Sequence, residues 1–278
     1  MAIFISTALL YNKNMKKVMG NTHFKKFVIS GLITSLCAPA ISYALSVIFE
    51  VHLTLPFLLI IYFLPLTIYF FDFSYKQYRL SFLAFLPAFF SVGLILKYSE
   101  NKFLLIYLIA LVSSLCYPIF LKDITKKIPL FKNFVVATMW AILVIIFSTY
   151  FELSFSYLYW IFFLLVFIRT FVDISYSDLK DINEDKSRGV KTLAVTVGID
   201  KTIIILQLLN LLSGLIIIIL SLSGILPLIS ISLLVPIIFS TLSIYYFSRR
   251  SNFSTLVVDL EYLFWFLSPL IVRILWNQ

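Results

Sequence analysis

The chain has 278 residues, of which 62% are hydrophobic and only 13% are charged. This balance excludes an ordinary water-soluble domain, in which about a quarter of the residues are charged. The net charge of +9 is explained by membrane topology and by attraction to anionic lipid. No nucleic-acid partner is therefore expected.

The hydrophobic residues gather in runs long enough to cross a bilayer, which takes about 20 mostly apolar residues. These runs lack the alternation of a membrane β-barrel. The sequence therefore predicts an all-α membrane protein, with an N-terminal tail over 1–26 and a single transmembrane domain over 27–278. Nine segments of suitable length and composition follow the tail: 27–49, 53–73, 80–97, 102–121, 133–151, 154–174, 202–224, 226–247 and 256–276.

Lys and Arg residues are distributed unequally between the two ends of the predicted helices. With the N-terminus inside, all but three of the 22 lie on the cytoplasmic side, and the exceptions are Lys97, Lys102 and Arg273. Basic residues concentrate in cytoplasmic loops of membrane proteins. We therefore expect an integral protein of the plasma membrane, with its N-terminus and its charged loops in the cytoplasm and its C-terminus outside.

The second and the sixth predicted helices both run inward, and both end in polar residues. The second ends near Asp72, with Lys76 and Arg79 following at the i+4 and i+7 positions, so that the three would share one helical face. The sixth leads into Asp178. This offset of four helices between two charged ends indicates two related halves, with a shared cavity on the cytoplasmic side.

Carboxylates are concentrated after the sixth predicted helix, where six of the 13 acidic residues fall between Asp173 and Asp200. Asp178, Asp181 and Asp185 are spaced i, i+3, i+7 and would share one face of a helix. A hard divalent cation such as Mg²⁺ would relieve their mutual repulsion. The alternative is a solvated acidic loop that is neutralised by its own basic residues: Lys180, Lys186, Arg188 and Lys191.

The stretch from Asp178 to Gly198 resembles the second Asp-rich motif of the UbiA superfamily of intramembrane prenyltransferases. That motif typically reads Asp-x-x-Asp-x-x-x-Asp, then Gly-x-x-Thr-Leu, then a further Gly, and this chain has Gly189, Thr192 and Leu193 in the corresponding places. The stretch from Lys127 to Ala137 is similar to the loop of the family that leads into helix five. The resemblance implies a nine-helix bundle around a central cavity.

The resemblance also implies a chemistry. Members of the family transfer a prenyl group from a prenyl diphosphate to a lipophilic acceptor, commonly an aromatic ring, within the membrane and with Mg²⁺ as cofactor. Carried over to this sequence, the acidic motif would hold the metal and Lys191 would contact the diphosphate. The substrate would also meet Lys132, Asn133 and Arg188, and the metal ligands would be Asp178, Asp181 and Asp185.

The first Asp-rich motif of the family departs from its usual pattern here. It usually carries Asn and two or three Asp residues, whereas this chain has Asp72 alone, with Lys76 four positions later. One interpretation is that Lys76 and Arg79 replace a second metal ion. The candidate catalytic residues are then Asp72, Lys76, Arg79 and Lys191. The other interpretations are a different substrate, or a silent relative that binds prenyl diphosphate or lipid without transfer.

A transporter or a lipid-binding membrane protein is the competing class. A transporter would need charged groups along a path through the membrane. Apart from Arg273, the polar groups of this sequence gather on one face, which favours the enzyme.

Overall fold

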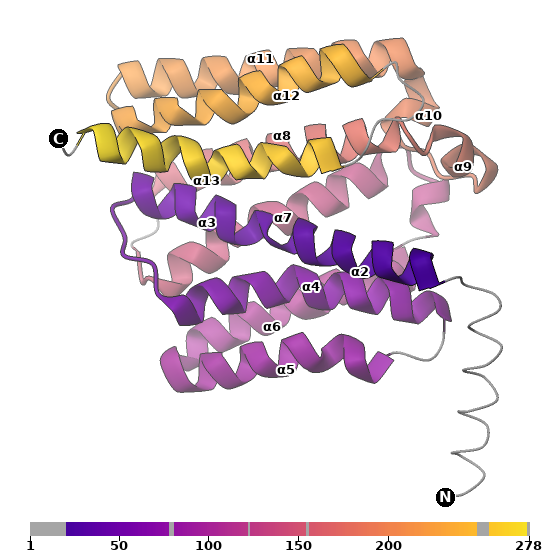
Figure 1. Ribbon diagram of the computed structural model, residues 1–278, viewed down its shortest axis with the longest axis horizontal. Helices are drawn as coiled ribbons and strands as arrows, with labels where there is room; N and C mark the ends of the chain where they lie inside the picture. Colours follow the sequence, from indigo (N-terminus) through magenta and orange to yellow (C-terminus); the bar gives the residue numbers. More distant parts are fainter. Residues whose placement is uncertain (1–20, 78–80, 122, 154–155, 249–255, 277–278) are drawn as a thin grey trace, which may run out of the picture.

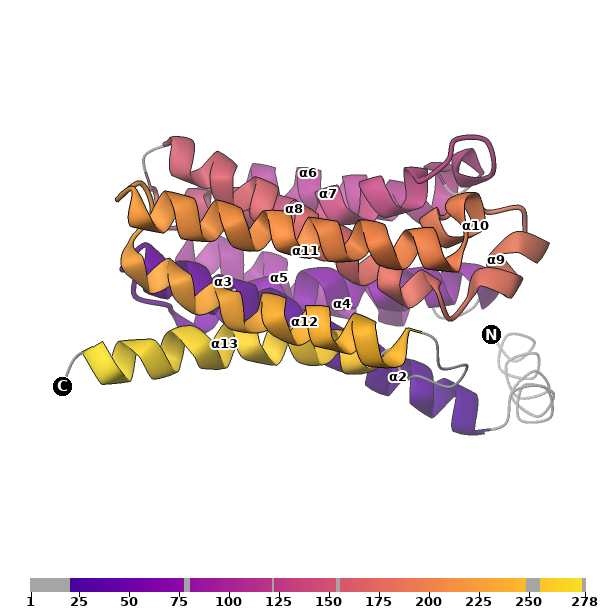
Figure 2. The ribbon, with the colours of Figure 1, turned by 90° about the horizontal axis from the view of Figure 1, so that it is seen from above.

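The computed structural model describes residues 21–77, 81–121, 123–153, 156–248 and 256–276, and every element in this part of the chain is helical. The long helices run side by side along one axis (Figure 1; Figure 2). In the first half these are α2 (Asn21–Ser35), α3 (Cys37–Ile48), α4 (Leu55–Gln77), α5 (Ser81–Tyr98), α6 (Asn101–Cys116) and α7 (Phe131–Tyr150), with the short turns η1 (Tyr117–Leu121) and η2 (Ile124–Lys126) before α7. In the second half the long helices are α8 (Tyr157–Asp178), α11 (Ile199–Leu222), α12 (Leu234–Phe247) and α13 (Leu256–Trp276). The short helices α9 (Ile182–Ser187) and α10 (Leu193–Val197) follow α8, and the short turn η3 (Leu228–Leu233) precedes α12.

The helices close into a ring. In chain order, α3 packs on α4, α4 on α6, α6 on α7, α7 on α8, α8 on α11, α11 on α12 and α12 on α13, and α13 returns to α3. Helix α5 lies against α4 and α6 at one edge of the bundle (Figure 1). This arrangement confirms the predicted class of an all-α membrane bundle around a central space.

The first predicted span is divided between α2 and α3 at Leu36. The cause is Pro39, which has no backbone N–H to donate and so tolerates only the first turn of a helix. The hydroxyl of Ser35 donates to the carbonyl of Gly31 at 2.6 Å, a local bond of the kind that satisfies polar groups in a medium without water. A single apolar run in the sequence is therefore a broken helix in the structure.

Seven helices among the described residues are long and apolar enough to cross a membrane. The sequence predicted nine spans, which is two more than these seven, so the predicted count is too high. The expected segment 80–97 corresponds to α5, whose described apolar part, Ala84–Tyr98, is short. The expected segment 256–276 corresponds to α13, which carries Asp259, Glu261 and Arg273.

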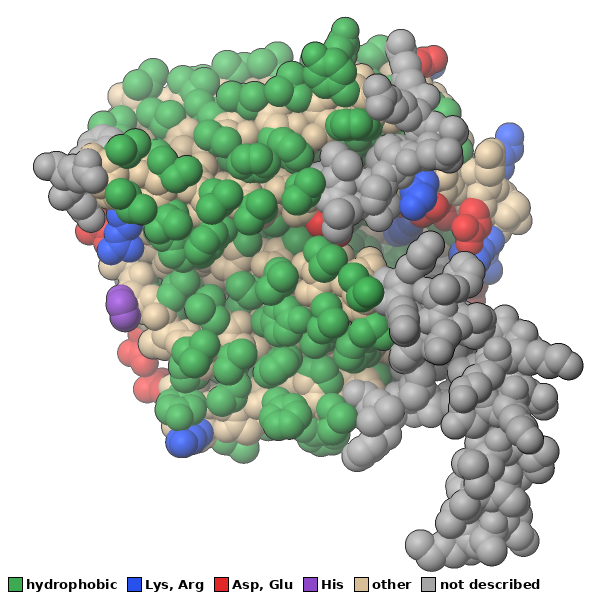
Figure 3. Space-filling model, in the orientation of Figure 1, with side chains coloured by type: hydrophobic (Ala, Val, Ile, Leu, Met, Phe, Trp, Pro, Cys, Tyr) green, Lys and Arg blue, Asp and Glu red, His purple; other side chains and the backbone are tan. Residues whose placement is uncertain are grey.

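The outer surface of the bundle is apolar over its middle, and charged side chains gather at its two ends (Figure 3). Large exposed side chains such as Leu105 on α6, Leu211 on α11 and Ile238 on α12 would be costly in water but match the tails of lipids. This pattern, together with the seven apolar helices, identifies an integral membrane protein.

Candidate functional site

Two loops meet at the end of the bundle that carries α9 and α10. The backbone N–H of Leu130 donates to the carbonyl of Lys191 at 2.7 Å, and the N–H of Lys191 donates to the carbonyl of Thr125 at 3.1 Å. These bonds join the loop before α7 to the loop after α9. The two stretches that carried sequence motifs are therefore adjacent in space.

The three carboxylates of the acidic motif do not lie on one continuous helix, as their spacing had predicted. Helix α8 ends at Asp178, a turn follows, and Asp181 precedes the first residue of α9, while Asp185 lies within α9. Gly189 then takes a φ of +72°, a left-handed conformation that residues with a Cβ rarely adopt. The turn redirects the chain, yet all three carboxylates line the same cavity.

Lys132, in the first turn of α7, lies between two of these carboxylates. Its ammonium is 2.6 Å from Oδ1 of Asp178 and 3.8 Å from Oδ2 of Asp185. The buried amide of Asn133 donates to the other oxygen of Asp178 at 2.9 Å and to the hydroxyl of Ser175 at 3.0 Å. Asp178 is thus fixed by two neighbours on α7.

Asp185 is less well satisfied. It is buried, and its Oδ2 atom has no hydrogen-bond partner among the described residues. Burial is the main reason that the pKa of the Asp185 carboxyl is raised above its ordinary value; the Lys132 ammonium opposes this effect, and the carboxylates of Asp178 and Asp181 add to it. A further positive charge at this place would stabilise the ionised carboxylate.

A polar cavity of about 540 Å³ extends from these carboxylates into the bundle. Asp72, in the C-terminal part of α4, lines the cavity together with Lys132 and Asp178. The expected meeting of the ends of the second and the sixth predicted helices is therefore observed. Arg188 also lines the cavity, although its guanidinium is paired with Glu184 at 2.5 Å and remains 63% exposed.

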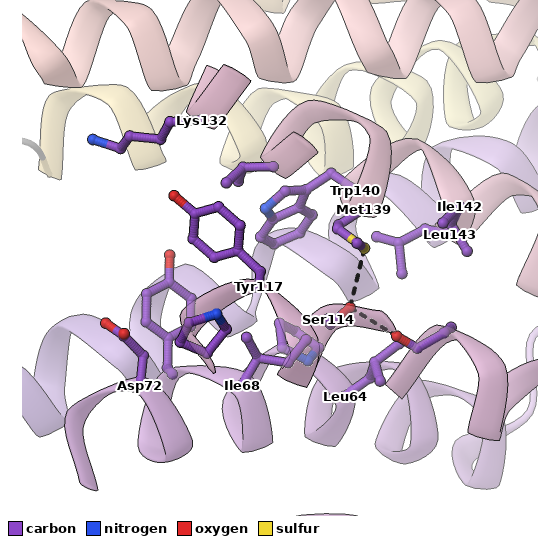
Figure 4. Close-up of a pocket in the computed structure, with 15 residues that line it drawn as sticks. Leu64, Ile68, Asp72, Ser114, Tyr117, Lys132, Met139, Trp140, Ile142 and Leu143 are labelled. Carbon is purple, nitrogen blue, oxygen red and sulfur yellow. Dashed lines mark hydrogen bonds between the residues drawn. The ribbon is translucent and has the colours of Figure 1, made fainter. Parts of the chain in front are cut away.

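A second cavity, of about 310 Å³, adjoins the first and is almost entirely apolar. Asp72 and Lys132 lie at one end of it, with Tyr117 between them, and Leu64, Ile142 and Leu143 line the opposite end (Figure 4). The two cavities share six lining residues: Tyr69, Asp72, Tyr117, Lys132, Val136 and Trp140. Together they form one space with a charged head and an apolar tail.

Comparison with known proteins identifies this arrangement. The sequence model of the UbiA prenyltransferase family matches residues 72–267, which include both charged helix ends and most of the ring. The chain belongs to the UbiA prenyltransferase family. No curated protein matches the chain.

Two solved structures share this fold. One is the apo structure of a UbiA homologue from Aeropyrum pernix K1, with 13% identity, a TM-score of 0.63, and coverage of 87% of this chain and 98% of that one. The other concerns digeranylgeranylglyceryl phosphate synthase in membranes, with 16% identity, a TM-score of 0.53, and coverage of 89% of this chain and 92% of that one. At these identities the likeness concerns the fold.

The structure gathers some of the UbiA-type site residues expected from the sequence and leaves others apart. Asp72, Lys132, Arg188 and the acidic motif line the polar cavity, and Asn133 supports Asp178 from behind. Lys191 does not line the cavity, because its ammonium donates to the carbonyl of Lys127 at 3.2 Å. The side chain of Lys76 and all of Arg79 lie outside the described residues.

The donors of the acidic motif fit Mg²⁺ in their chemistry. They are carboxylate oxygens, the ligands that this ion prefers, and one of them, Oδ2 of Asp185, is buried without a partner among the described residues. They are not preassembled around a metal, because no group of three or more metal-binding side chains converges within the described part of the chain. The ammonium of Lys132 stands between Asp178 and Asp185 instead.

Two features of the site region were missed from the sequence. Asp173 lines the polar cavity, and its position inside a predicted membrane helix was the signal, because ionisable residues there mark functional sites by default. Arg169 was counted among the cytoplasmic cations, but it is buried and ion-paired with Glu261 at 2.5 Å. Charge inside the bundle is therefore not confined to one face, and this pair corrects that expectation.

Proposed function

We propose that the protein transfers a prenyl group from a prenyl diphosphate to a lipophilic acceptor inside the membrane, with Mg²⁺ as cofactor. The observation that carries this proposal is the shared wall of the two cavities. An amphiphile with an anionic head and an apolar chain would place its head near Lys132 and Asp72 and its chain between Leu64 and Leu143.

The ion would be held by Asp181, Asp185 and Asp178, the last after release from Lys132. When bound, Mg²⁺ neutralises charge on the diphosphate and so favours its departure. The ammonium of Lys132 is placed to donate to the same diphosphate oxygens, and the flexible stem of lysine allows it to move from carboxylate to phosphate. Asn133 keeps Asp178 oriented during this exchange.

The junction of the two cavities is where the reacting carbon would lie. Tyr117 and Trp140 line that junction, and the faces of aromatic rings attract positive charge. They would stabilise the allylic carbocation that forms when the C–O bond breaks. The apolar wall beyond them excludes water, which would otherwise capture the cation.

The orientation follows from the distribution of basic residues. Helix α9, which holds Asp185, lies at the same end of the bundle as the start of α2 (Figure 1). The ammonium of Lys132 is 3.8 Å from Asp185, and the lysine-rich loop before α7 is hydrogen-bonded to the loop after α9. Basic loops face the cytoplasm. We therefore place the charged mouth of the cavity at the cytoplasmic face of the cell membrane, where soluble diphosphates have access.

The test uses purified protein in lipid nanodiscs, with radiolabelled geranyl, farnesyl and geranylgeranyl diphosphate and a membrane lipid extract as the source of acceptor. Mg²⁺-dependent appearance of label in a new lipid is expected. Asp181→Asn and Asp185→Asn should weaken Mg²⁺-supported diphosphate binding about tenfold or more, because each removes a charged ligand.

The matched control is Lys186→Ala, which changes an exposed residue of the same loop and should leave binding unchanged. Equal diphosphate affinity in the control and in the two carboxylate variants would show that the acidic motif is only a charged loop and binds no metal. Tight binding of prenyl diphosphate without transfer to any lipid would identify a binding protein and contradict the enzyme.

A further inference from the structure

The polar cavity has a second end, which lies deeper in the bundle than the acidic motif. On α8, Thr170, Asp173 and Ser177 line it with the i, i+3, i+7 spacing of one helical face. Asp173 lies five residues before Asp178, which corresponds to about 7.5 Å along the helix axis. Asp259 and Tyr262 of α13 also line the cavity, and Tyr262 lies beside Asp173. This deeper end is distinct from the mouth at which Lys132 lies.

Asp173 is buried at this deeper end, next to Tyr262 and Glu261. Its relative exposure is 5%, and neither of its carboxylate oxygens has a donor in hydrogen-bonding geometry within the described part of the chain. The hydroxyl of Thr170, one turn earlier and only 2% exposed, is also without a partner there. Buried polar groups in native proteins are normally satisfied, so an unmet acceptor that lines a cavity indicates a ligand that donates to it.

The nearest cation cannot neutralise Asp173. The guanidinium of Arg169 donates from Nε and from an Nη atom to the two carboxylate oxygens of Glu261, at 3.0 and 2.5 Å, and from its other Nη atom to Asn210. It is 1% exposed, so it reaches no ligand in the cavity. Its positive charge is matched by Glu261, and it donates no hydrogen bond to Asp173.

The other side chains around this end add acceptors or hydroxyl groups. Asp259 accepts a hydrogen bond from Thr34 at 3.1 Å, and Tyr262 lies beside Asp173 with its ring stacked near that of Trp140 at a centroid distance of 6.2 Å. A ligand that carries a carboxylate or phosphate would be repelled here. A neutral molecule with a hydroxyl group would satisfy Asp173 and meet no repulsion.

We propose that this deeper end binds the prenyl acceptor, that the acceptor is a neutral lipophilic alcohol or phenol, and that Asp173 removes its proton. The inference rests on the proposed function. The C–O bond of the prenyl diphosphate breaks, and its electron pair leaves with the diphosphate. The hydroxyl oxygen of the acceptor forms the new bond to the prenyl carbon, and its proton passes to the carboxylate of Asp173 and then to water at the mouth.

The test separates acceptor binding from transfer. Wild-type protein is loaded with Mg²⁺ and a non-reactive thiodiphosphate analogue of geranylgeranyl diphosphate, and binding of radiolabelled oleyl alcohol is compared with that of oleic acid. The alcohol should bind at least about tenfold more tightly, because a site with an unpaired acceptor rejects a ligand that cannot donate and repels an anion. Equal or tighter binding of the acid would overturn the proposal.

Asp173→Asn should remove this preference and lower single-turnover transfer to oleyl alcohol about a hundredfold, as expected for loss of a general base. Affinity for the prenyl analogue should stay unchanged. Asp173→Glu should restore part of the transfer rate, which a purely structural role would not produce. Asp123→Asn is the matched control, since it makes the same change at an exposed loop carboxylate.

If Asp173→Asn does not fold, Tyr262→Phe provides the second variant, because it removes only a hydroxyl from the same wall; it should weaken alcohol binding several-fold. Normal alcohol binding in the folded variants would overturn the acceptor subsite even where prenyl transfer occurs. Failure of wild-type protein to bind the prenyl analogue at all would instead contradict the proposed function, so the two failures are distinguishable.

Discussion

The ammonium of Lys132 is 2.6 Å from Oδ1 of Asp178, and this contact joins the first turn of α7 to the last turn of α8. The same ammonium is 3.8 Å from Asp185. A single flexible cation therefore stands among the carboxylates that are the metal-binding candidates. Such a cation competes with a metal ion for the carboxylates. Because the lysine side chain is flexible, its ammonium can also leave the carboxylates and bind a phosphate group instead.

The position of Lys132 leads to a prediction about Lys132→Met. Without substrate, this variant should bind Mg²⁺ more tightly than wild type, because no ammonium competes for Asp178 and Asp185. In the absence of Mg²⁺ its affinity for prenyl diphosphate should fall about tenfold, because one charge-assisted bond is lost. Isothermal titration calorimetry in nanodiscs measures both. Lys126→Met is the control, since Lys126 pairs with Asp123 on the surface. Weaker binding of both Mg²⁺ and prenyl diphosphate would contradict a competition between Lys132 and the metal ion.

Local features of this site could be predicted from the sequence, and long-range ones could not. Asp178, Asp181 and Asp185 are close in the chain, so all three line one cavity even though a turn separates α8 from α9. Arg169 and Glu261 are 92 positions apart, and no local spacing indicates that they meet. Their contact depends on how α8 and α13 pack, and that is a property of the whole ring.

Removal of one partner from the buried pair of Arg169 and Glu261 should strongly destabilise the protein. Both side chains are almost fully buried, and removal of one partner leaves an uncompensated charge in the bundle. Arg169→Met or Glu261→Gln should therefore lower the free energy of unfolding by about 3–5 kcal/mol. The double variant should recover part of this loss, because no unpaired charge remains.

Denaturant titration of the purified protein in detergent, followed by circular dichroism, measures these differences. Glu184→Gln breaks the exposed pair with Arg188 and is the control; surface pairs contribute about 0–1 kcal/mol. A loss in the single variants no larger than that of the control would contradict an uncompensated buried charge.

The apolar cavity should limit the length of the prenyl chain. Ala110 on α6 lines it one turn beyond Ser114, away from Asp72. Ala110→Phe should fill the far end of the cavity. Geranylgeranyl diphosphate, whose chain would reach that end, should then lose at least about tenfold in affinity, because its chain would be overpacked. Geranyl diphosphate is shorter and should keep most of its affinity. Competition binding with the two diphosphates measures the effect. Val112→Phe, on the lipid-facing side of the same helix, is the control. Equal losses for both chain lengths would place the chain elsewhere.

Gly189 should be needed for its backbone conformation and not for its small volume. Its φ is +72°, and a Cβ added to it would meet no other atom within 4 Å among the described residues. Gly189→Ala should therefore destabilise the loop by about 1–2 kcal/mol, because the left-handed region is unfavourable for a residue with a Cβ. Hydrogen exchange of the backbone amides between Asp185 and Lys191 should become faster. Gly93→Ala is the control, since Gly93 is helical and also has open space around it; it should not destabilise the protein.

The orientation of the bundle can be tested by labelling single introduced cysteines in intact cells. Lys126 lies between α6 and α7, and Lys102 is the second residue of α6, so α6 places the two at opposite ends of the bundle (Figure 1). Positive-inside bias predicts that the Lys126 end is cytoplasmic. Lys102→Cys should therefore react with a membrane-impermeant maleimide in intact cells, and Lys126→Cys should react only after permeabilisation. The unsubstituted protein, whose Cys37 is buried and Cys116 partly so, gives the background. The opposite pattern would place the acidic motif outside the cell, away from cytoplasmic diphosphates, and would contradict the proposed orientation.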